Sequence, residues 1–105
     1  MRILFDQGTP VPLRDHLSEH RVDTAFERGW AERANGAMLD AAEDEGYDLF
    51  ITTDGNLRYQ QNLEDRRLAI LVLLSTSWPR IRGRIEAIRS AVARIGPGDY
   101  VEVDI

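Results

Sequence analysis

The chain contains no cysteine and no lysine, so all 13 of its basic residues are arginines. Without cysteine it has no disulfide, no thiolate nucleophile and no structural thiolate zinc site. Without lysine it lacks the residue that a phosphate-binding loop places on the phosphates of a nucleotide. Phosphoacceptor signalling domains and phosphatases with an aspartate nucleophile also use a lysine against the phosphoryl group. The two absences therefore disfavour all of these classes.

Long hydrophobic runs are also missing. The longest apolar stretch, residues 68–74, is the size of a strand and far short of the ~18 residues that a membrane-spanning helix needs. No basic and apolar leader opens the chain. With 105 residues, of which 43% are hydrophobic, we expect one globular domain over residues 1–105. We expect it to be cytoplasmic, with no membrane partner.

Charge is unevenly distributed along the chain, whose net charge is −5. Residues 1–57 hold 12 acids against 5 arginines, whereas residues 58–94 hold 8 arginines against 3 acids. An acidic protein is not a general nucleic-acid binder. An arginine-rich stretch beside an acidic, metal-holding edge is nevertheless compatible with a phosphodiester substrate.

Hydrophobic periodicity predicts alternating strands and helices. Strands are expected at residues 2–5, within 21–26 (where Val22, Thr24 and Phe26 alternate with polar residues), and at 48–53, 68–74 and 100–105. Helices are expected at residues 10–20, 35–45, 57–63 and 78–95, with Asn35 and Ser77 as N-caps of the second and the last. This order predicts one three-layer α/β/α domain with a small, mainly parallel central sheet.

Two of the expected strands each stop at an aspartate. Asp6 follows the first strand and precedes a glycine turn, and Asp54 follows the strand at residues 48–53. If these strands are parallel neighbours, both carboxylates emerge at the edge where open α/β sheets bind ligands. Two acids brought together there repel each other unless a cation lies between them. Metal-dependent phosphate chemistry is therefore the first hypothesis, because Mg²⁺ is held by one or two carboxylates, water and a phosphate-bearing substrate.

Other polar residues could assist such a site. Asn56 lies two residues beyond Asp54 and offers an amide oxygen, a ligand type that Mg²⁺ and Mn²⁺ accept. The hydroxyls of Thr52 and Thr53 could steady a water or a phosphate, although threonines are also ordinary strand formers. Arg58 follows the expected turn after Asp54, and Arg80 and Arg84 lie near the start of the last helix; each could contact a nucleic-acid backbone, or simply face solvent.

His16 and His20 are candidates for a second metal site. These residues are four apart, a spacing that can chelate zinc on one helix. No third ligand is evident, and the face of an amphipathic helix explains the pair better.

Several motifs resemble those of the short bacterial PIN-like proteins. They are Leu4-Phe5-Asp6, Asn35-Gly36 at a helix start, and the segment from Phe50 through Thr52-Thr53-Asp54-Gly55-Asn56 to Leu57. The following residues 58–63 and Ser77-Trp78-Pro79 resemble one branch of that group. The resemblance covers nearly the whole chain and is most specific between residues 52 and 63.

The resemblance implies a PIN-like fold and a function. Members of the wider PIN superfamily are mostly ribonucleases, often the toxins of toxin–antitoxin pairs. Their strand-end acids bind Mg²⁺ or Mn²⁺, which activates water against a phosphodiester. By this resemblance Asp6 and Asp54 are the catalytic metal ligands, and Asn56 stands where many relatives have another acid. The implied partners are an RNA substrate and a small antitoxin-like protein, and a homodimer is an open alternative to a monomer.

The chain departs from this family in its acids. Relatives usually carry an acidic residue in the first turn of the helix that begins here at Asn35, whereas this chain has Asn35, Gly36 and Ala37. Asp40 lies a turn further along, so Asn35, Asp40 and Thr53 are auxiliary candidates. Two carboxylates suit one ion better than the two ions, about 3.5–4 Å apart, of two-metal hydrolysis. The alternative hypothesis is therefore a catalytically weak or inactive PIN-like module that binds RNA or a protein partner.

Overall fold

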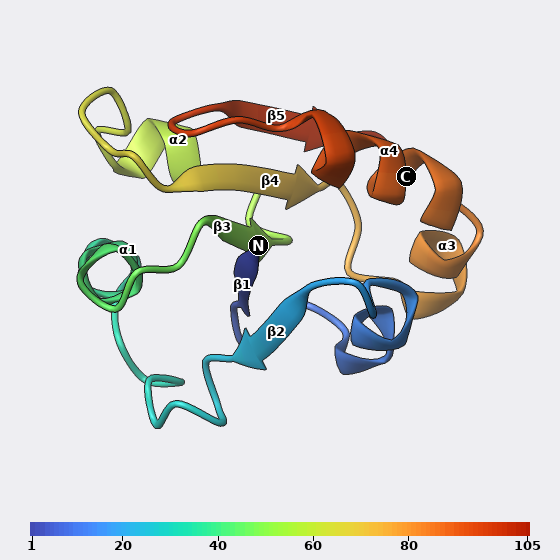
Figure 1. Ribbon diagram of the computed structural model, residues 1–105, viewed down its shortest axis with the longest axis horizontal. Helices are drawn as coiled ribbons and strands as arrows, with labels where there is room; N and C mark the ends of the chain where they lie inside the picture. Colours follow the sequence, from blue (N-terminus) through green and yellow to red (C-terminus); the bar gives the residue numbers. More distant parts are fainter.

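Five parallel strands form the centre of the protein in the computed structural model, which describes residues 1–105 (Figure 1). In spatial order they are β2 (Arg21–Thr24), β1 (Arg2–Phe5), β3 (Leu49–Thr52), β4 (Ala69–Leu73) and β5 (Tyr100–Val103). Every neighbouring pair is parallel, so the five carboxyl ends lie at one edge of the sheet. The expectation of an α/β domain is confirmed.

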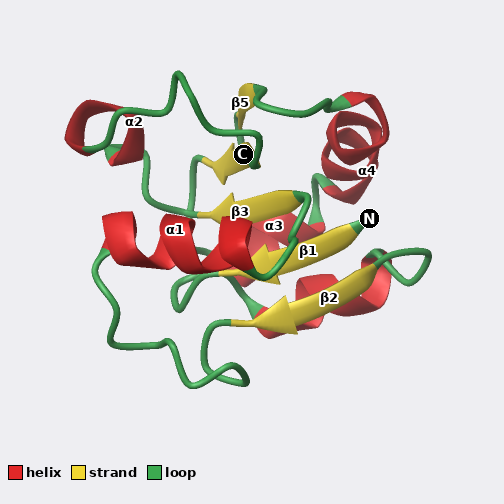
Figure 2. Cartoon of the chain, turned by 60° about the vertical axis from the view of Figure 1, so that its left-hand side comes forward, coloured by secondary structure: helices red, strands yellow, loops and turns green.

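Helices cover both faces of this sheet, giving three layers. One face carries α1 (Asn35–Asp44) and α2 (Leu57–Gln60), and the other carries the 3₁₀ helix η1 (Val11–His16), α3 (Trp78–Arg82) and α4 (Ile85–Arg94). Figure 2 shows α1 in front of the sheet and α3 behind it. None of these helices combines the length and the apolar character of a membrane-spanning segment.

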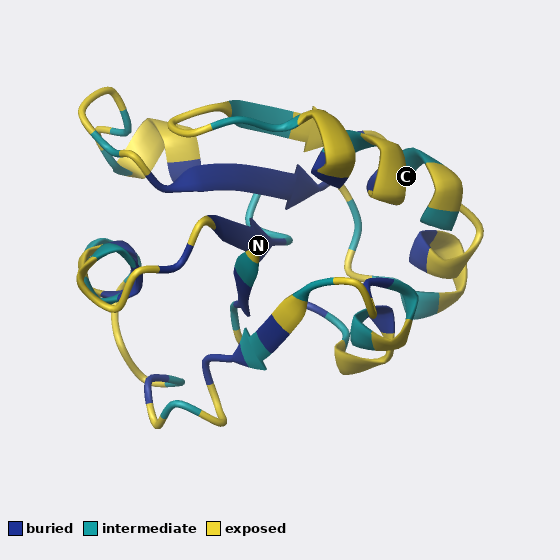
Figure 3. Cartoon of the chain, viewed as in Figure 1, coloured by how far each residue is buried: buried dark blue, intermediate teal, exposed yellow.

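The core is divided by the sheet because successive strand residues point to opposite faces. Ile3 and Phe5 pack with Ile88 and Val92 of α4, whereas Leu4 packs on the face of α1. β4 is buried along its whole length (Figure 3), as expected for a strand that is covered on both faces. Each such apolar side chain contributes roughly 1.5–3 kcal/mol on burial.

The four strand connections do not share one hand. The β1–β2 connection through η1 and the β4–β5 connection through α3 and α4 lie on the same face of the sheet. They nevertheless lead in opposite directions across the strand order, since β2 is the strand at one side of the sheet and β5 the strand at the other. The β2–β3 and β3–β4 connections lie on the other face. The β4–β5 connection is therefore opposite in hand to the other three, an uncommon arrangement for parallel strands.

The expectation of one helix over residues 78–95 is wrong, because the chain breaks between α3 and α4. Gly83 ends α3, and Arg84, with φ −121° and ψ 23°, turns the chain into α4. Ile81 and Ile88 are still buried on one side, so the apolar stripe survives the break. Ser77 caps α3 as expected, its hydroxyl accepting a hydrogen bond from the Arg80 N–H.

Other expected boundaries also need correction. The helix expected at residues 10–20 is the shorter 3₁₀ helix η1, and the helix expected at 57–63 ends at Gln60. β2 ends at Thr24, so Phe26 lies outside the strand and is 74% exposed. The N-cap of α1 is Ala34, not Asn35, because the Asn35 amide hydrogen-bonds to Asp54 instead.

Candidate functional site

Asp6 lies at the carboxyl end of β1, with its carboxylate held by two threonines. The Thr9 hydroxyl donates to Asp6 Oδ1 at 2.6 Å, and the Thr52 hydroxyl donates to Asp6 Oδ2. Thr9 reaches back because residues 6–9 form a turn in which the Thr9 N–H donates to the Asp6 carbonyl at 3.2 Å. Thr52 is placed by strand register, since Phe5 lies opposite Ile51.

Both threonines are buried, with exposed fractions of 4% for Thr9 and 1% for Thr52. The Thr9 hydroxyl also lies 2.9 Å from the carbonyl oxygen of Ile51, so one proton serves two acceptors. Hydrogen bonds to a charged group contribute roughly 1.5–3 kcal/mol each. These contacts fix the orientation of the Asp6 carboxylate relative to the sheet edge.

Asp54 follows β3 in a tight polar turn and has its own set of donors. Its Oδ1 accepts a hydrogen bond from the Asn56 N–H at 2.9 Å, and its Oδ2 accepts one from Asn35 Nδ2 at 3.1 Å. The Asp54 N–H donates to the Thr52 hydroxyl at 3.0 Å. Thr52 therefore links the two aspartates, because its hydroxyl accepts from Asp54 and donates to Asp6.

Thr53 packs against the turn that follows Asp6. A Cβ atom added at Gly8 would lie 2.9 Å from Thr53 Oγ1 and 4.0 Å from Asp6 Oδ1. Only glycine allows the turn and this hydroxyl to approach so closely. The structure thus brings together five of the residues chosen from the sequence: Asp6, Asn35, Thr53, Asp54 and Asn56.

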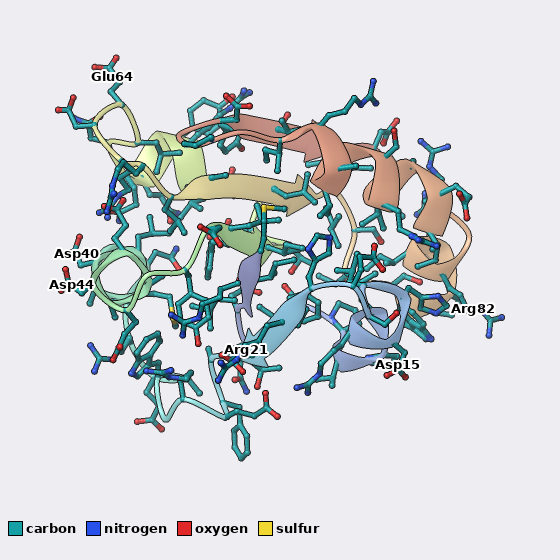
Figure 4. The ribbon with its side chains drawn as sticks, in the orientation of Figure 1. Asp15, Arg21, Asp40, Asp44, Glu64 and Arg82 are labelled. Atoms are coloured by element: carbon teal, nitrogen blue, oxygen red, sulfur yellow. The ribbon has the colours of Figure 1, made fainter.

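Asp40 does not join this group. Its side chain is 69% exposed and pairs with Arg66, with 2.9 Å between the carboxylate oxygen and the guanidinium nitrogen. Figure 4 shows Asp40 projecting outward from α1 beside Asp44. Asp40 is a surface carboxylate, and this makes it a useful control.

The three arginines selected as nucleic-acid contacts are each engaged with the protein itself. Arg58 donates to the Tyr59 hydroxyl at 2.6 Å and lies over the ring of Tyr100. Arg80 and Arg84 donate to the backbone carbonyls of Ile105 and Asp104, at 3.1 and 3.2 Å. None of these arginines hydrogen-bonds to Asp6 or Asp54.

His16 and His20 contact different groups of the protein. The His16 ring lies 5.9 Å from the ring of Trp78, centre to centre. His20 Nδ1 lies 3.2 Å from the N-terminal nitrogen of Met1. These contacts account for both rings as packing and surface groups.

Sequence reasoning missed Thr9 and assigned Thr52 a different task. A signal for Thr9 was present in Asp6-Gln7-Gly8-Thr9, a turn sequence that returns a hydroxyl to the aspartate three residues before it. The signal for Thr52 is a polar residue at the end of an otherwise apolar, fully buried strand. A buried hydroxyl needs a partner, and here that partner is the Asp6 carboxylate.

Two cavities bear on where a ligand could lie. A cavity of about 420 Å³ is bounded by Asp6, Thr9 and the residues that follow β2. The largest cavity, about 610 Å³, lies at the opposite edge of the sheet, beside Met1, Asp48 and Ala69. Ligands of open α/β sheets bind at the carboxyl edge, so the smaller cavity is the relevant one.

The carboxylates at this edge keep acceptor sites that no protein group fills. No group of three or more histidine, aspartate or glutamate residues is placed to hold a metal ion. Each oxygen of the two carboxylates accepts a single protein hydrogen bond and retains a free lone pair. Carboxylate and amide oxygens, which Asp6, Asp54 and the exposed Asn56 carry, are ligand types that Mg²⁺ accepts while it keeps several of its waters.

In comparisons with known proteins, no family model, no curated protein and no solved structure matches the chain.

Proposed function

We propose that the protein is a PIN-like, metal-dependent endoribonuclease and the toxin component of a toxin–antitoxin pair. The observation that carries the proposal is the position of Asp6 and Asp54 after the neighbouring strands β1 and β3, where the Thr52 hydroxyl donates to the Asp6 carboxylate and accepts from the Asp54 N–H. The resemblance of residues 50–57 to PIN-like proteins supplies the family. The toxin role, the small antitoxin-like partner and a cytoplasmic site of action rest on that resemblance alone.

Asp6, Asp54 and Asn56 would hold Mg²⁺ or Mn²⁺. When bound, such an ion supplies positive charge to the phosphodiester and lowers the pKa of water. This chemistry suits a chain without cysteine or lysine, because no covalent nucleophile or lysine is needed against the phosphate.

The protein's own contribution is to hold the carboxylates in place. Thr9 and Thr52 orient Asp6, and Asn35 orients Asp54 from the first turn of α1. Such preorganisation avoids the cost of rotating the ligands when the substrate binds. Residues that orient metal ligands commonly affect metal affinity or activity by 10- to 100-fold, on the order of the effect expected for these three.

Cleavage of a labelled single-stranded RNA in the presence of Mn²⁺ or EDTA tests the proposal. We expect cleavage by the wild-type protein with Mn²⁺, and a loss of more than about 100-fold in D6N and in D54N. D40N is the matched control, because it removes an exposed carboxylate of the same charge from α1. Equal, negligible cleavage by the wild type and the D6N/D54N double variant would refute the ribonuclease proposal.

A non-catalytic PIN-like module is the second candidate. It is favoured by the neutral residues Ala37 and Asn56 and by the absence of a third acid at the site. Such a module would bind RNA or a protein partner without metal-dependent cleavage. RNA binding that persists in D6N/D54N, with no cleavage by the wild type in Mg²⁺ or Mn²⁺, would establish it.

A further inference from the structure

The cavity beside Asp6 has a wall that the proposed chemistry does not use. Besides Asp6, Gln7 and Thr9, it is lined by Val11, Arg14, Thr24, Phe26 and Glu27. Its volume of about 420 Å³ lies within the range of small-ligand sites. It therefore has room for a flat heterocycle directly beside one of the two carboxylates.

Phe26 is the unusual member of this wall. Its side chain belongs to neither core cluster and is 74% exposed, and Val11 in the same cavity is 50% exposed. A single exposed phenylalanine needs no explanation on its own. Here two apolar side chains face the same polar cavity, next to the proposed catalytic edge.

The turn that carries Phe26 is held rigidly. The Thr24 N–H donates to Glu27 Oε1 at 2.9 Å, and the Glu27 N–H donates back to the Thr24 hydroxyl at 3.1 Å. Arg14 adds hydrogen bonds of 2.9 and 3.1 Å to the two oxygens of the same carboxylate. Because these reciprocal bonds fix residues 24–27, the Phe26 ring is presented at the cavity without a packing role of its own.

The charges of the cavity select against a phosphate. Asp6 and Glu27 are acidic, and Arg14 is paired with Glu27. The net charge of the wall is therefore negative, which disfavours an anion. A neutral, planar and apolar-faced group with a polar edge fits better, because the aromatic ring offers a stacking face and Gln7 offers an amide.

We propose that this cavity holds one unpaired base of the RNA strand, stacked on Phe26, beside the phosphodiester at Asp6. The position of the phosphodiester rests on the proposed function. An unpaired base is required because a base inside a duplex has no free face to stack on a side chain. Phe26 is then a substrate-positioning residue that makes the enzyme selective for single-stranded RNA.

Binding without turnover isolates this role. The assay uses the D54N variant. Asp54 does not line the cavity, and its replacement by asparagine removes one proposed metal ligand. Anisotropy of a labelled ten-nucleotide single-stranded RNA is measured for D54N and for D54N/F26A, beside the same RNA annealed to its complement. A 2-aminopurine base in the strand reports stacking through quenching of its fluorescence.

We expect F26A to weaken single-strand binding by roughly 10-fold or more, to abolish the quenching and to leave duplex binding unchanged. F26Y keeps the ring face and should bind like the parent, whereas F26L keeps apolar area without a stacking face and should resemble F26A. Because Phe26 is exposed, the melting temperature should be the same in all of these variants.

The outcomes separate the inference from the proposed function. If the wild type cleaves RNA and F26A has the same KM as the wild type, the inference alone is overturned. The exposed ring would then be assigned to contact with a protein partner. RNA binding that depends on Phe26, without metal-dependent cleavage, would support the inference and refute the proposed ribonuclease function. An absence of RNA binding by both the wild type and D54N would overturn both.

Discussion

Replacement of Thr52 by valine tests the link between the two aspartates. Valine keeps the shape of the side chain but removes the hydroxyl that donates to Asp6 and accepts from the Asp54 N–H. A hydrogen bond to a charged group contributes about 1.5–3 kcal/mol, and the partly buried Asp54 N–H left unpaired costs up to about 1–3 kcal/mol. Since the two effects are not additive, T52V should lower the free energy of unfolding by roughly 2–4 kcal/mol.

Thermal or urea unfolding measures this loss. For a domain of this size, the expected change corresponds to a fall in melting temperature of roughly 10–30 °C. T52S is the matched control, because it keeps the hydroxyl and removes one methyl group, at a cost of about 1 kcal/mol. Under the proposed function, RNA cleavage by T52V should fall as well, whereas cleavage by T52S should stay near that of the wild type.

A double-mutant cycle with D6N shows whether the loss comes through Asp6. If it does, T52V should cost about 1–3 kcal/mol less in the D6N background than in the wild type. Costs that add within about 0.5 kcal/mol would refute the reasoning, because the hydroxyl would then stabilise the fold without the carboxylate.

Three further predictions concern stability. The hydrogen bond from the Thr24 backbone, followed by those from Arg14, lowers the pKa of Glu27 below its ordinary value of 4.5. The ionised Glu27 therefore contributes its full stabilisation above pH 4.5, and this contribution is lost as the pH falls below that value. The difference in melting temperature between the wild type and E27Q should therefore shrink from pH 7 to pH 3, and a constant difference would contradict this. Burial, and then the hydrogen bond to Glu102, raises the pKa of Tyr100 from 10.0 to about 12. The folded state should therefore lose stability between these two pH values. In melts at alkaline pH, Y100F should show a smaller loss than the wild type. Gly98 has a φ of +76°, and a Cβ added there would lie 3.0 Å from a backbone carbonyl oxygen. G98A should therefore lower the free energy of unfolding, measured by urea titration, by more than about 1 kcal/mol. G29A is the control and should cost less, because Gly29 has a similar φ of +75° but open space around it.

The main features of the fold could be predicted from the sequence because the signals were local. Short apolar runs bounded by polar turns indicate strands, and the fully apolar run at residues 68–74 indicates a strand covered on both faces. The aspartates that end two of these runs were placed at one sheet edge by the topology alone.

The break between α3 and α4 was harder to predict. The apolar spacing of Ile81, Ile85 and Ile88 continues through Gly83 and therefore resembles one helix. On either side of the turn, Arg80 and Arg84 donate to the carbonyls of Ile105 and Asp104 at the end of the chain. Such long-range contacts leave no trace in local periodicity.

The location of Asp6 and Asp54 at one sheet edge could be predicted from the sequence, whereas the side chains that hydrogen-bond to them could not. The role of Thr52 depends on the register of β1 against β3, which four-residue strands do not specify by themselves. Asn35 has the ordinary signature of an N-cap, yet its amide donates to Asp54 and leaves α1 without a side-chain cap. A helix without its cap is less stable by roughly 1 kcal/mol, a local cost of the kind found at functional sites.

The claim that Asp6 and Asp54 together form one cation site is tested most directly by calorimetric titration of the protein with Mn²⁺. The proposed function predicts one bound ion per chain, loss of binding in D6N and in D54N, and unchanged binding in D40N. Binding that is equally strong in the D6N/D54N double variant, or an absence of binding by the wild-type protein, would contradict it.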